Sequence, residues 1–327
     1  MSLRVSVVVP TCRRLALLQR CLAALLAQTL DPHSFEIVVV DDGAEDPVRD
    51  AVLDLAARHE VPTIRYLRTA GTLGPAVARN RGWHAADAPV VAFTDDDAIP
   101  EPGWLAAGLA ALEPHPHRPA VAGQVVVPLP ADRPPTDHER MTQGLQDAEF
   151  VAANAFVRTG ALVAVGGFDE RFRRAWREDA DLQFRLQDEL GPVPRCAQAR
   201  VVHPVREVPW GASLGQQRNS FFDALLYKKH PRRYRERIRR VPPWDDYTIV
   251  LATLAAPALA LAGADGLALA ACGLVLMLIG RLAWRRLAGA DRSPRHVGEM
   301  LATSALIPYL SVWWRLRGAW HFRTPFV

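Results

Sequence analysis

Three consecutive carboxylates, Asp95, Asp96 and Asp97, are the residues of this chain best suited to chemistry. They follow an apolar run at 90–94 that is rich in strand-forming residues. Alternate side chains of a strand share a face, so we expect Asp95 and Asp97 to point one way and Asp96 the other. Oxygen ligands suit Mg²⁺ or Mn²⁺, and these cations in turn suit a diphosphate. A solvated acidic turn is the alternative that the triplet alone leaves open.

Polar residues also follow two earlier strand-like runs. An apolar run at 5–9 leads to Thr11, and a second at 35–40 leads to Asp41 and Asp42. Helical apolar spacing lies between the runs, and this alternation predicts an α/β fold with a doubly wound parallel sheet. Ligands of such sheets bind beyond the carboxyl ends of the strands. We therefore expect these polar groups and the three aspartates to meet at one edge of the sheet.

Four short motifs carry a resemblance to a known family. The sequences VVVPT, VVDDG, ARNRG and FTDDD begin at residues 7, 39, 78 and 93. Their order and spacing resemble those of the family 2 glycosyltransferases, whose GT-A fold is a Rossmann-like, mostly parallel sheet flanked by helices. The resemblance implies an enzyme that moves a sugar from a nucleotide diphosphate to an acceptor.

The same resemblance implies roles for individual residues. The implied donor-binding residues are Pro10, Thr11, Arg13, Asp41, Asp42, Arg79, Asp95 and Asp96. Thr11 and the aspartate pair of the second motif would hold the nucleoside, and Arg79 would lie near the base or the diphosphate. From the residues alone, the glycine-bearing loop before Arg79 fits either phosphate contact or an ordinary turn. Asp97 would be the direct ligand of Mn²⁺ or Mg²⁺, with Asp95 beside it, and the cation would make the diphosphate a better leaving group.

A second acidic pair, Glu178 and Asp179, precedes leucines spaced by four, which indicate a helix. Helix dipoles stabilise carboxylates in the first turn, so capping alone would explain the pair. The sequence GGFDE at 166–170 and this pair nevertheless resemble family elements, and in inverting members the pair supplies the catalytic base. We predict that Asp179, with Glu178 as the second choice, takes the proton from the acceptor hydroxyl, so that the displacement inverts the anomeric carbon.

Two further polar residues follow in or after predicted strands. His203 ends a short strand at 200–203, where many GT-A enzymes place a histidine that binds metal or diphosphate, and we predict it as a metal ligand. A lone histidine is more often no ligand at all. Asn154 lies in a predicted strand at 150–157, and we interpret it as a structural amide rather than an acceptor contact.

The C-terminal third has a different composition. A basic run at 228–240 precedes apolar stretches at 248–264, 267–280 and 300–314. The first two are shorter than the roughly 20 residues that a membrane span needs. Aromatic and arginine residues flank one side of each, and only a small turn at Asp265 separates them. The positive-inside rule then predicts a two-helix membrane hairpin with its turn outside.

Other arrangements of this third stay open. A re-entrant hairpin, interfacial helices and a buried soluble helix pair are the alternatives. The end of the chain at 313–322 is predicted to be an interfacial segment. The basic run would contact anionic membrane lipids. Nucleic acid is a poorer explanation of the charge because no recognition motif accompanies it, so we expect no nucleic acid partner.

Together these patterns predict three parts. A GT-A catalytic domain would occupy 1–225, a basic juxtamembrane segment 226–247, and membrane-associated helices 248–327. The N-terminus lacks the apolar region of a secretory signal, so we expect a protein of the cell membrane with its catalytic domain in the cytoplasm.

The expected function is metal-dependent, inverting transfer of a sugar to a hydroxyl or phosphate acceptor, either a saccharide or a lipid-linked molecule. One alternative is a polyprenyl-phosphate glycosyltransferase. A nucleotidyltransferase on a related fold would need a glycine- and lysine-rich loop that the N-terminus lacks. A non-catalytic membrane scaffold is disfavoured by the intact carboxylates.

Overall fold

The computed structural model describes residues 2–326, and the chain divides into two compact units. The sheet unit comprises Met1–Pro128 and Gln143–Val205, and the helical unit comprises Leu129–Thr142 and Arg206–Val327. The chain therefore passes between the two units three times. The three-part division predicted from the sequence stays a prediction.

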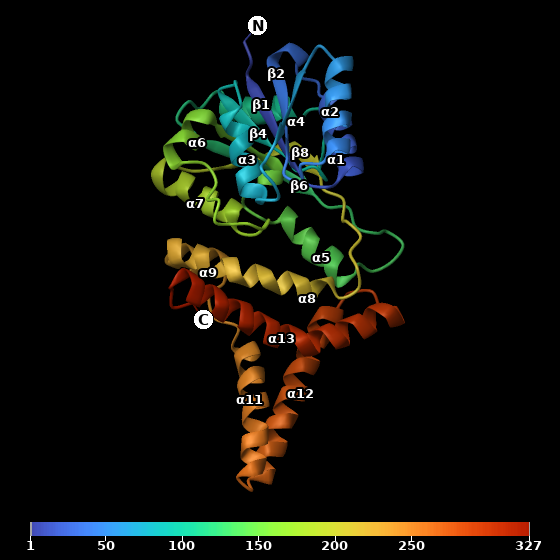
Figure 1. Ribbon diagram of the computed structural model, residues 1–327, viewed down its shortest axis with the longest axis vertical. Coiled ribbons are helices and arrows are strands. Elements are labelled where there is room, and N and C mark those ends of the chain that lie inside the picture. Colours follow the sequence, from blue (N-terminus) through green and yellow to red (C-terminus); the bar gives the residue numbers. More distant parts are fainter. Residues whose placement is uncertain (1, 327) are drawn as a thin grey trace. The chain divides into compact units, whose positions relative to one another are not determined.

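The sheet unit is built around one sheet, which has eight strands in the described residues (Figure 1). The strands are β1 (Val5–Thr11), β2 (Phe35–Asp41), β3 (Thr63–Arg68), β4 (Val90–Phe93), β5 (Ile99–Pro100), β6 (Ala120–Val126), β7 (Ala155–Arg158) and β8 (Arg195–Val202). Their order is β3-β2-β1-β4-β7-β6-β8-β5. Strands β3, β2, β1 and β4 are parallel, β6 pairs in parallel with β8, and β7 and β5 pair antiparallel with their neighbours.

Helices cover both faces of this sheet. They are α1 (Leu15–Leu26), η1 (Pro32–Ser34), α2 (Asp46–Arg58), α3 (Pro75–His84), α4 (Trp104–Leu112), η2 (Gly144–Gln146), η3 (Ala152–Asn154), α6 (Thr159–Val165) and α7 (Glu178–Glu189). Along β1, Val7 and Val9 belong to one buried cluster and Val8 to another, so both faces of the strand are covered. This explains why β1 reads as a continuous apolar run rather than as an alternating one. The predicted α/β fold is confirmed.

The strand predicted at 150–157 is wrong in its first half. A 3₁₀ turn, η3, occupies Ala152–Asn154, and strand β7 begins only at Ala155. The turn directs the Asn154 amide into the interior, where it accepts a hydrogen bond from Trp104 Nε1 and donates to the carbonyl oxygens of Gln124 and Ala199. These contacts confirm that Asn154 is a structural amide. A buried apolar run does not by itself distinguish a strand from a turn.

The helical unit contains the C-terminal helices. These are α8 (Ala212–Gln216), η4 (Gln217–Asn219), α9 (Ser220–Lys229), α10 (Pro231–Arg233), η5 (Tyr234–Ile238), α11 (Trp244–Leu261), α12 (Asp265–Leu287) and α13 (Pro294–Phe322). Within this unit, α11 and α12 form a hairpin, and α13 crosses the open end of the hairpin, opposite its turn (Figure 1). Among the described helices, α12 alone is long and apolar enough to cross a membrane, with a mean hydropathy of 2.1 in its most apolar window.

The segment Leu129–Thr142 is held by the helical unit, although both of its neighbours in sequence belong to the sheet unit. It includes most of helix α5 (Asp137–Gln143). The Asp137 carboxylate lies 2.8 Å from Arg286 Nη2, and its backbone N–H donates to His296 Nε2. The backbone N–H of Asp291 donates to the Pro135 carbonyl oxygen. Three positions of the helical unit, Arg286, Asp291 and His296, thus fix this segment of the chain.

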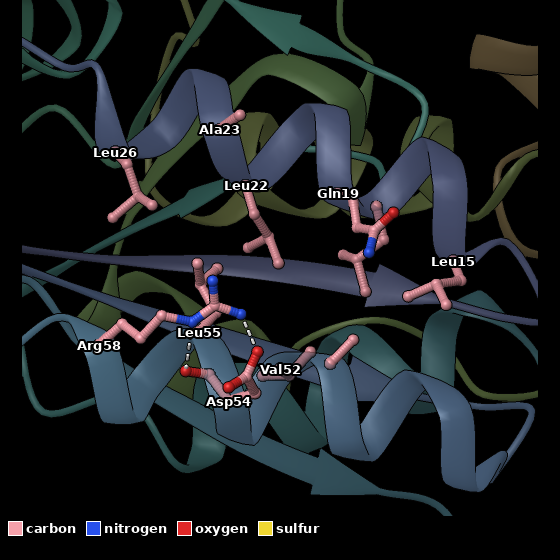
Figure 2. A pocket seen from close by; sticks show the side chains of 11 residues that line it. Leu15, Gln19, Leu22, Ala23, Leu26, Val52, Asp54, Leu55 and Arg58 are labelled. Atoms are coloured by element: carbon pink, nitrogen blue, oxygen red, sulfur yellow. Dashed lines mark hydrogen bonds and ion pairs between the residues drawn. The ribbon is translucent and has the colours of Figure 1, made fainter.

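An apolar hollow of about 280 Å³ lies between α1 and α2 (Figure 2). Leucines of the two helices face one another across it, and an ion pair between Arg58 and Asp54 closes one end. Its lining residues are Leu15, Leu18, Gln19, Leu22, Ala23, Leu26, Ala51, Val52, Asp54, Leu55 and Arg58. None of the residues predicted to do chemistry lines this hollow.

Candidate active site

The predicted polar residues meet at one edge of the sheet because the parallel strands end there together. Thr11, the last residue of β1, pairs in register with Asp41, the last residue of β2. The triplet that begins at Asp95 follows β4, which lies on the other side of β1. His203 directly follows β8, which lies parallel to β6. Loops from four strands therefore supply the site.

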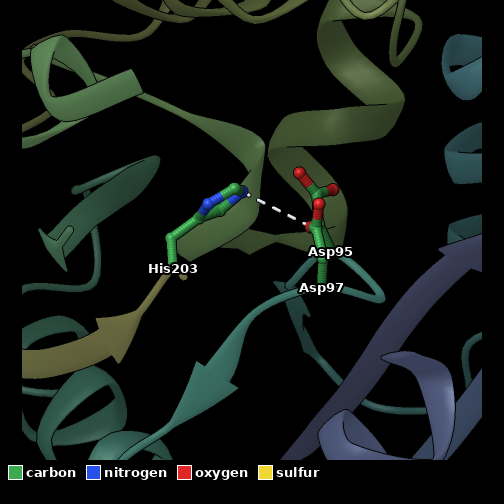
Figure 3. A group of neighbouring side chains, drawn as sticks. All are labelled: Asp95, Asp97 and His203. Atoms are coloured by element: carbon green, nitrogen blue, oxygen red, sulfur yellow. Dashed lines mark ion pairs between the residues drawn. The ribbon is translucent and has the colours of Figure 1, made fainter. Parts of the chain in front are cut away.

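Asp95, Asp97 and His203 form a compact group (Figure 3). Each offers one ligand atom, and these atoms all lie within 4.8 Å of one another. His203 Nε2 is 3.4 Å from Asp97 Oδ1, and both residues are buried, whereas Asp95 is partly exposed. Two carboxylates and an imidazole are a donor set that divalent Mn²⁺ accepts, so the residues fit the predicted cation. The structure brings the three predicted ligands together, and their binding of a metal stays a prediction.

Asp96 faces away from this group. Its Oδ2 accepts a hydrogen bond from Thr11 Oγ1 at 2.8 Å, and its Oδ1 lies 3.2 Å from Arg14 Nη1. Burial raises the pKa of Asp96 to about 6 against the opposing effect of Arg14. The three aspartates lie in a turn beyond β4 rather than in the strand itself, yet Asp95 and Asp97 still diverge from Asp96 as expected.

Arg79, on α3, joins the aspartate triplet to the second acidic pair. Its Nη2 donates to Asp95 Oδ1 at 2.8 Å, and its Nη1 donates to Glu178 Oε1 at 3.0 Å. Nη1 also lies 3.8 Å from Asp179 Oδ1. Burial alone would lower the pKa of Arg79, but the three carboxylates hold it well above its usual value. The implied contact of Arg79 with the base or diphosphate stays a prediction, because its guanidinium is already shared among carboxylates.

Glu178 and Asp179 begin α7, and they have different environments. Arg177 adopts a left-handed backbone with φ of 77°, which turns the chain into the helix. Glu178 is buried, whereas the Asp179 side chain is 25 % exposed. Asp179 Oδ2 accepts a hydrogen bond from the Ala152 N–H, and Oδ1 has no hydrogen-bond partner among the described residues. Asp179 Oδ1 is therefore the oxygen that is left without a hydrogen bond within the described chain, although the atom itself is buried.

The pKa of both carboxyl groups is raised. For Glu178, burial and the Asp179 charge outweigh Arg79 and hold the pKa well above its usual value of 4.5. Burial likewise raises the pKa of Asp179, and Arg79 opposes the shift. Arg79 thus makes it less costly for Asp179 to be ionised in a partly closed site.

The carboxylates of Asp41 and Asp42 both accept hydrogen bonds from neighbouring loops. Asp41 accepts hydrogen bonds from three consecutive backbone N–H groups, at 43–45, and from the Tyr66 hydroxyl. Asp42 accepts from the N–H groups of Leu73 and Gly74 and from the Thr69 hydroxyl. Both carboxylates therefore hold the loops at the sheet edge, and their contact with a nucleoside stays a prediction.

The remaining predicted donor residues lie at the start of the same edge. Pro10 is buried within β1. The Arg13 side chain is 67 % exposed, lies 3.5 Å from Glu45 and adopts a left-handed backbone. An exposed guanidinium at this edge is free to turn toward an anion, so the position is compatible with the predicted role of Arg13.

Sequence reasoning missed two polar residues of the site. Arg14 is an ion-pair partner of Asp96 and lies 4.0 Å from Asp97. Asn80 donates to the Phe168 carbonyl oxygen and to Glu170, and so fixes the GGFDE loop to α3. The position of Asn80 beside Arg79 in the third motif was a signal for it. No comparable signal marks Arg14, because its partners are 82 and 83 residues away in the sequence.

Residues 6–175 match the sequence pattern of the family described as "Glycosyl transferase family 2". The chain belongs to this family. Three relatives illustrate the similarity. Validoxylamine A glucosyltransferase of Streptomyces hygroscopicus subsp. limoneus is 31 % identical over 220 residues, covering 55 % of this chain and 47 % of the relative. Pre-mycofactocin glycosyltransferase of Mycobacterium tuberculosis is 31 % identical over 195 residues, covering 56 % and 38 %. Glucosyl-dolichyl phosphate glucuronosyltransferase of Haloferax volcanii is 26 % identical over 264 residues, covering 72 % and 77 %. This family 2 chain thus spans about half or less of the length of the first two relatives.

A solved structure resembles the chain over nearly its whole length. Mannosyltransferase PcManGT from Pyrobaculum calidifontis, in complex with GDP-Man and Mn²⁺, has a TM-score of 0.59 and 19 % identity, and the match covers 97 % of this chain and 87 % of that one. At this level of identity the likeness establishes the fold. The family 2 chain has the GT-A fold with additional C-terminal helices, as the sequence predicted.

Proposed function

We propose that this family 2 protein is an inverting glycosyltransferase that moves a sugar from a nucleotide-diphosphate donor to a hydroxyl or phosphate acceptor. One observation carries the proposal. Arg79 bonds to Asp95 of the candidate cation group and lies within ion-pair distance of Asp179. The group suited to the diphosphate and the carboxylate suited to the acceptor are therefore neighbours in one site.

Asp95, Asp97 and His203 would hold the cation, Mn²⁺ or Mg²⁺. When bound, such an ion neutralises the diphosphate and makes it a better leaving group. The mixed oxygen and nitrogen donor set favours Mn²⁺ over Mg²⁺, because Mg²⁺ prefers oxygen ligands. The solved complex of PcManGT with GDP-Man and Mn²⁺ supports this choice.

Asp179 would act on the acceptor. Its Oδ1 takes the proton of the acceptor hydroxyl while that oxygen bonds to the anomeric carbon and the bond from this carbon to the diphosphate breaks. A phosphate acceptor is already ionised and would need no base. Arg79 would lower the cost of ionising Asp179 for this step, and the buried Glu178 carboxylate would hold Arg79 in place. Attack from the side opposite the leaving group inverts the anomeric configuration.

The donor would lie along the edge formed by β1, β2 and the loop after β3. The predicted donor residues there are Pro10, Thr11, Arg13, Asp41, Asp42, Arg79, Asp95 and Asp96. Thr11 and Asp42 shape this edge through hydrogen bonds to the triplet and to the loop at 69–74. The nucleoside would rest against this ordered backbone.

The acceptor would be lipid-linked, with the protein at the cell membrane and its catalytic part in the cytoplasm. Large apolar side chains of the α11–α12 hairpin are exposed, including Leu261 at 91 % and Leu269 at 73 %. Exposure of this kind marks a membrane contact rather than a soluble helix pair. The basic run at 228–240 would contact anionic lipids. The Haloferax relative is named for glucosyl-dolichyl phosphate, so a sugar linked to a polyprenyl phosphate is the first acceptor to test, and polyprenyl phosphate itself is the second.

The test compares three single variants in membranes that contain the full chain. We expect Asp97→Asn to lose Mn²⁺-dependent binding of nucleotide sugars by calorimetry and to lose transfer. With a hydroxyl acceptor, Asp179→Asn should keep that binding and lose transfer by about a thousandfold, because a positioned base contributes this much. With a phosphate acceptor, which needs no base, the same variant should keep both binding and transfer. Asp188→Asn, an exposed residue of the same helix, is the matched control and should change neither.

Mass spectrometry of products from UDP- and GDP-sugars identifies the reaction, with a polyprenyl-phosphate-linked sugar, polyprenyl phosphate or a saccharide as acceptor. Normal transfer to a hydroxyl acceptor by folded Asp97→Asn and Asp179→Asn variants would refute the assignment. Absence of metal-dependent nucleotide binding in the unaltered protein would favour a non-catalytic scaffold instead.

A further inference from the structure

Helix α13 buries several polar side chains and exposes large apolar ones, which is unusual for a helix in water. Its buried side carries the polar residues Thr303, Ser304, Ser311 and Arg315, none more than 6 % exposed, beside the apolar Met300 and Val312. Its most exposed side carries large apolar residues instead, with Trp313 at 60 % and Trp320 at 88 % exposure. We call Leu306, Trp313, Leu316 and Trp320 the α13 stripe. A helix of a soluble unit normally shows the reverse arrangement.

The stripe points away from α9. Arg315 lies 3.9 Å from Asp223 of α9, and a Cβ on Gly318 would meet the Phe221 carbonyl oxygen of α9 at 2.5 Å. These two residues therefore mark the face of α13 that packs on α9. Residues two positions apart in a helix are about 200° apart around its axis. Trp313, Leu316 and Trp320 each stand two positions from Arg315 or Gly318, so they lie on the opposite face.

The α11–α12 hairpin leaves the unit from the same face. The Tyr309 hydroxyl is 2.8 Å from Thr253 Oγ1 of α11, and Tyr309 is one helical turn before Trp313. Within the helical unit, α9 lies on one side of α13 and the hairpin extends from the other (Figure 1). The α13 stripe and the open end of the α11–α12 hairpin thus lie on one surface.

Basic side chains border this surface. Arg317 is exposed and stacks on the Trp314 ring at 5.0 Å, and Arg323 follows the end of the helix. Lys228 Nζ donates to the Phe322 carbonyl oxygen at the same end. Tryptophan and leucine beside arginine and lysine are the composition that the boundary between lipid headgroups and acyl chains favours.

From this geometry we propose that α13 lies flat in the headgroup boundary of an anionic membrane, with the α13 stripe turned toward the acyl chains. The proposal rests on the membrane attachment proposed above and extends it. In this arrangement the hairpin enters the membrane along the bilayer normal. Helix α13 lies parallel to the membrane surface and sets the depth to which the hairpin enters. A bilayer accounts for the whole surface, because it covers a continuous apolar face and neutralises the cations that border it.

The experiment measures the depth of single nitroxide labels in the full chain. Cysteine is introduced by Trp313→Cys, Leu316→Cys or Trp320→Cys after Cys12→Ser and Cys272→Ala remove the two cysteines that are not buried. Leu269→Cys reports on the hairpin, and Trp210→Cys, an exposed tryptophan of the same unit, is the matched control. The protein is reconstituted in phosphatidylcholine vesicles with a minority of phosphatidylglycerol. Collisions with oxygen report lipid, and collisions with a water-soluble nickel chelate report water.

Labels at 313, 316 and 320 should lose nickel collisions and gain oxygen collisions relative to the label at 210, with a shallower depth than the label at 269. Nickel collisions equal to those at 210, while 269 lies in lipid, would overturn the α13 proposal and leave the hairpin intact. Labels shielded from both reagents would also overturn it, because a protein partner then covers the stripe. Nickel access at 269 as well would refute the membrane attachment itself.

Discussion

The carboxylates of the site are compatible with one another only because one guanidinium is shared among them. Arg79 is 3 % exposed and contacts Asp95, Glu178 and Asp179. A buried charge is costly unless it is paired, so these four residues depend on one another. Arg79 Nη1 donates to Glu178 Oε1, whereas the buried Asp179 Oδ1 accepts no hydrogen bond from the described residues.

Replacement of Arg79 should therefore affect both stability and chemistry. Arg79→Met leaves three carboxylates uncompensated and should lower the free energy of unfolding by about 3–5 kcal/mol. Arg79→Lys keeps the charge but not the two-pronged contact, and should fold while transfer falls at least roughly tenfold. Thermal unfolding and initial rates measure the two effects. Arg81→Met, at an exposed position of the same helix, is the control, and an equal loss in both methionine variants would contradict the prediction.

Glu178 should make stability depend on pH. Its folded pKa lies above its usual value of 4.5, chiefly through burial. Its contribution to stability is thus fully present below that value and is lost as the pH rises through the folded pKa. Glu178→Gln stays neutral, so we expect its melting temperature to change less than that of the unaltered protein between about pH 5 and pH 9. Glu189→Gln, exposed on the same helix, should follow the unaltered curve, and parallel curves for all three proteins would exclude this role of Glu178.

At the scale of elements, the loop after β3 is positioned by a carboxylate from the neighbouring strand. Asp42, just after β2, binds two backbone N–H groups of this loop, at Leu73 and Gly74. The loop leads into α3, which carries Arg79. The position of Asp42 at the end of β2 therefore fixes the start of α3, and with it the position of Arg79.

Loss of the Asp42 charge should loosen this loop. Hydrogen bonds to charged groups contribute about 1.5–3 kcal/mol, so Asp42→Asn should raise the KM for the donor roughly tenfold or more, with a smaller effect on kcat. Without donor, the amides of 71–74 should exchange hydrogen faster, which direct nucleoside contact alone would not cause. Asp50→Asn, exposed on α2, is the control. Unchanged amide exchange in Asp42→Asn would show that the carboxylate does not hold the loop.

The sequence predicted elements better than contacts. The runs at 5–9 and 35–40 became β1 and β2 because buried parallel strands need continuous apolar residues. The order of strands accounts for the position of Asp95 and Asp97, whereas Asp179 reaches the site from the first turn of α7. The use of Asp41 and Asp42 by backbone groups was not predictable, since it depends on loop conformations without periodicity. The turn at Ala152–Asn154 was missed for the same reason. Arg14 joins the site only through tertiary contacts.

At the scale of the whole molecule, the chain is threaded through both units rather than arranged as consecutive blocks. Leu129–Thr142 leaves the sheet unit after β6 and returns before β7, and between them it belongs to the helical unit. Within the helical unit, Arg286 of α12 connects this segment to two other elements. Its guanidinium donates hydrogen bonds to Asp137 of this segment and to Ser213 of α8. It also donates to the hydroxyl groups of Thr303 and Ser304 on α13.

Arg286 should therefore stabilise the helical unit far more than its neighbour Arg285 does. The Arg286 side chain is 10 % exposed and that of Arg285 is 64 % exposed. Arg286→Met leaves Asp137 unpaired beside buried hydroxyl groups, and should cost about 3 kcal/mol of the free energy of unfolding in detergent micelles. Arg285→Met removes a solvated ion pair with Asp245 and should cost less than about 1 kcal/mol. In the Arg286 variant, limited proteolysis should begin within 129–142, because that segment has lost its strongest contact. Equal unfolding energies for the two variants would show that the buried network does not hold the segment, and a double-mutant cycle with Asp137→Asn would then give a coupling energy near zero.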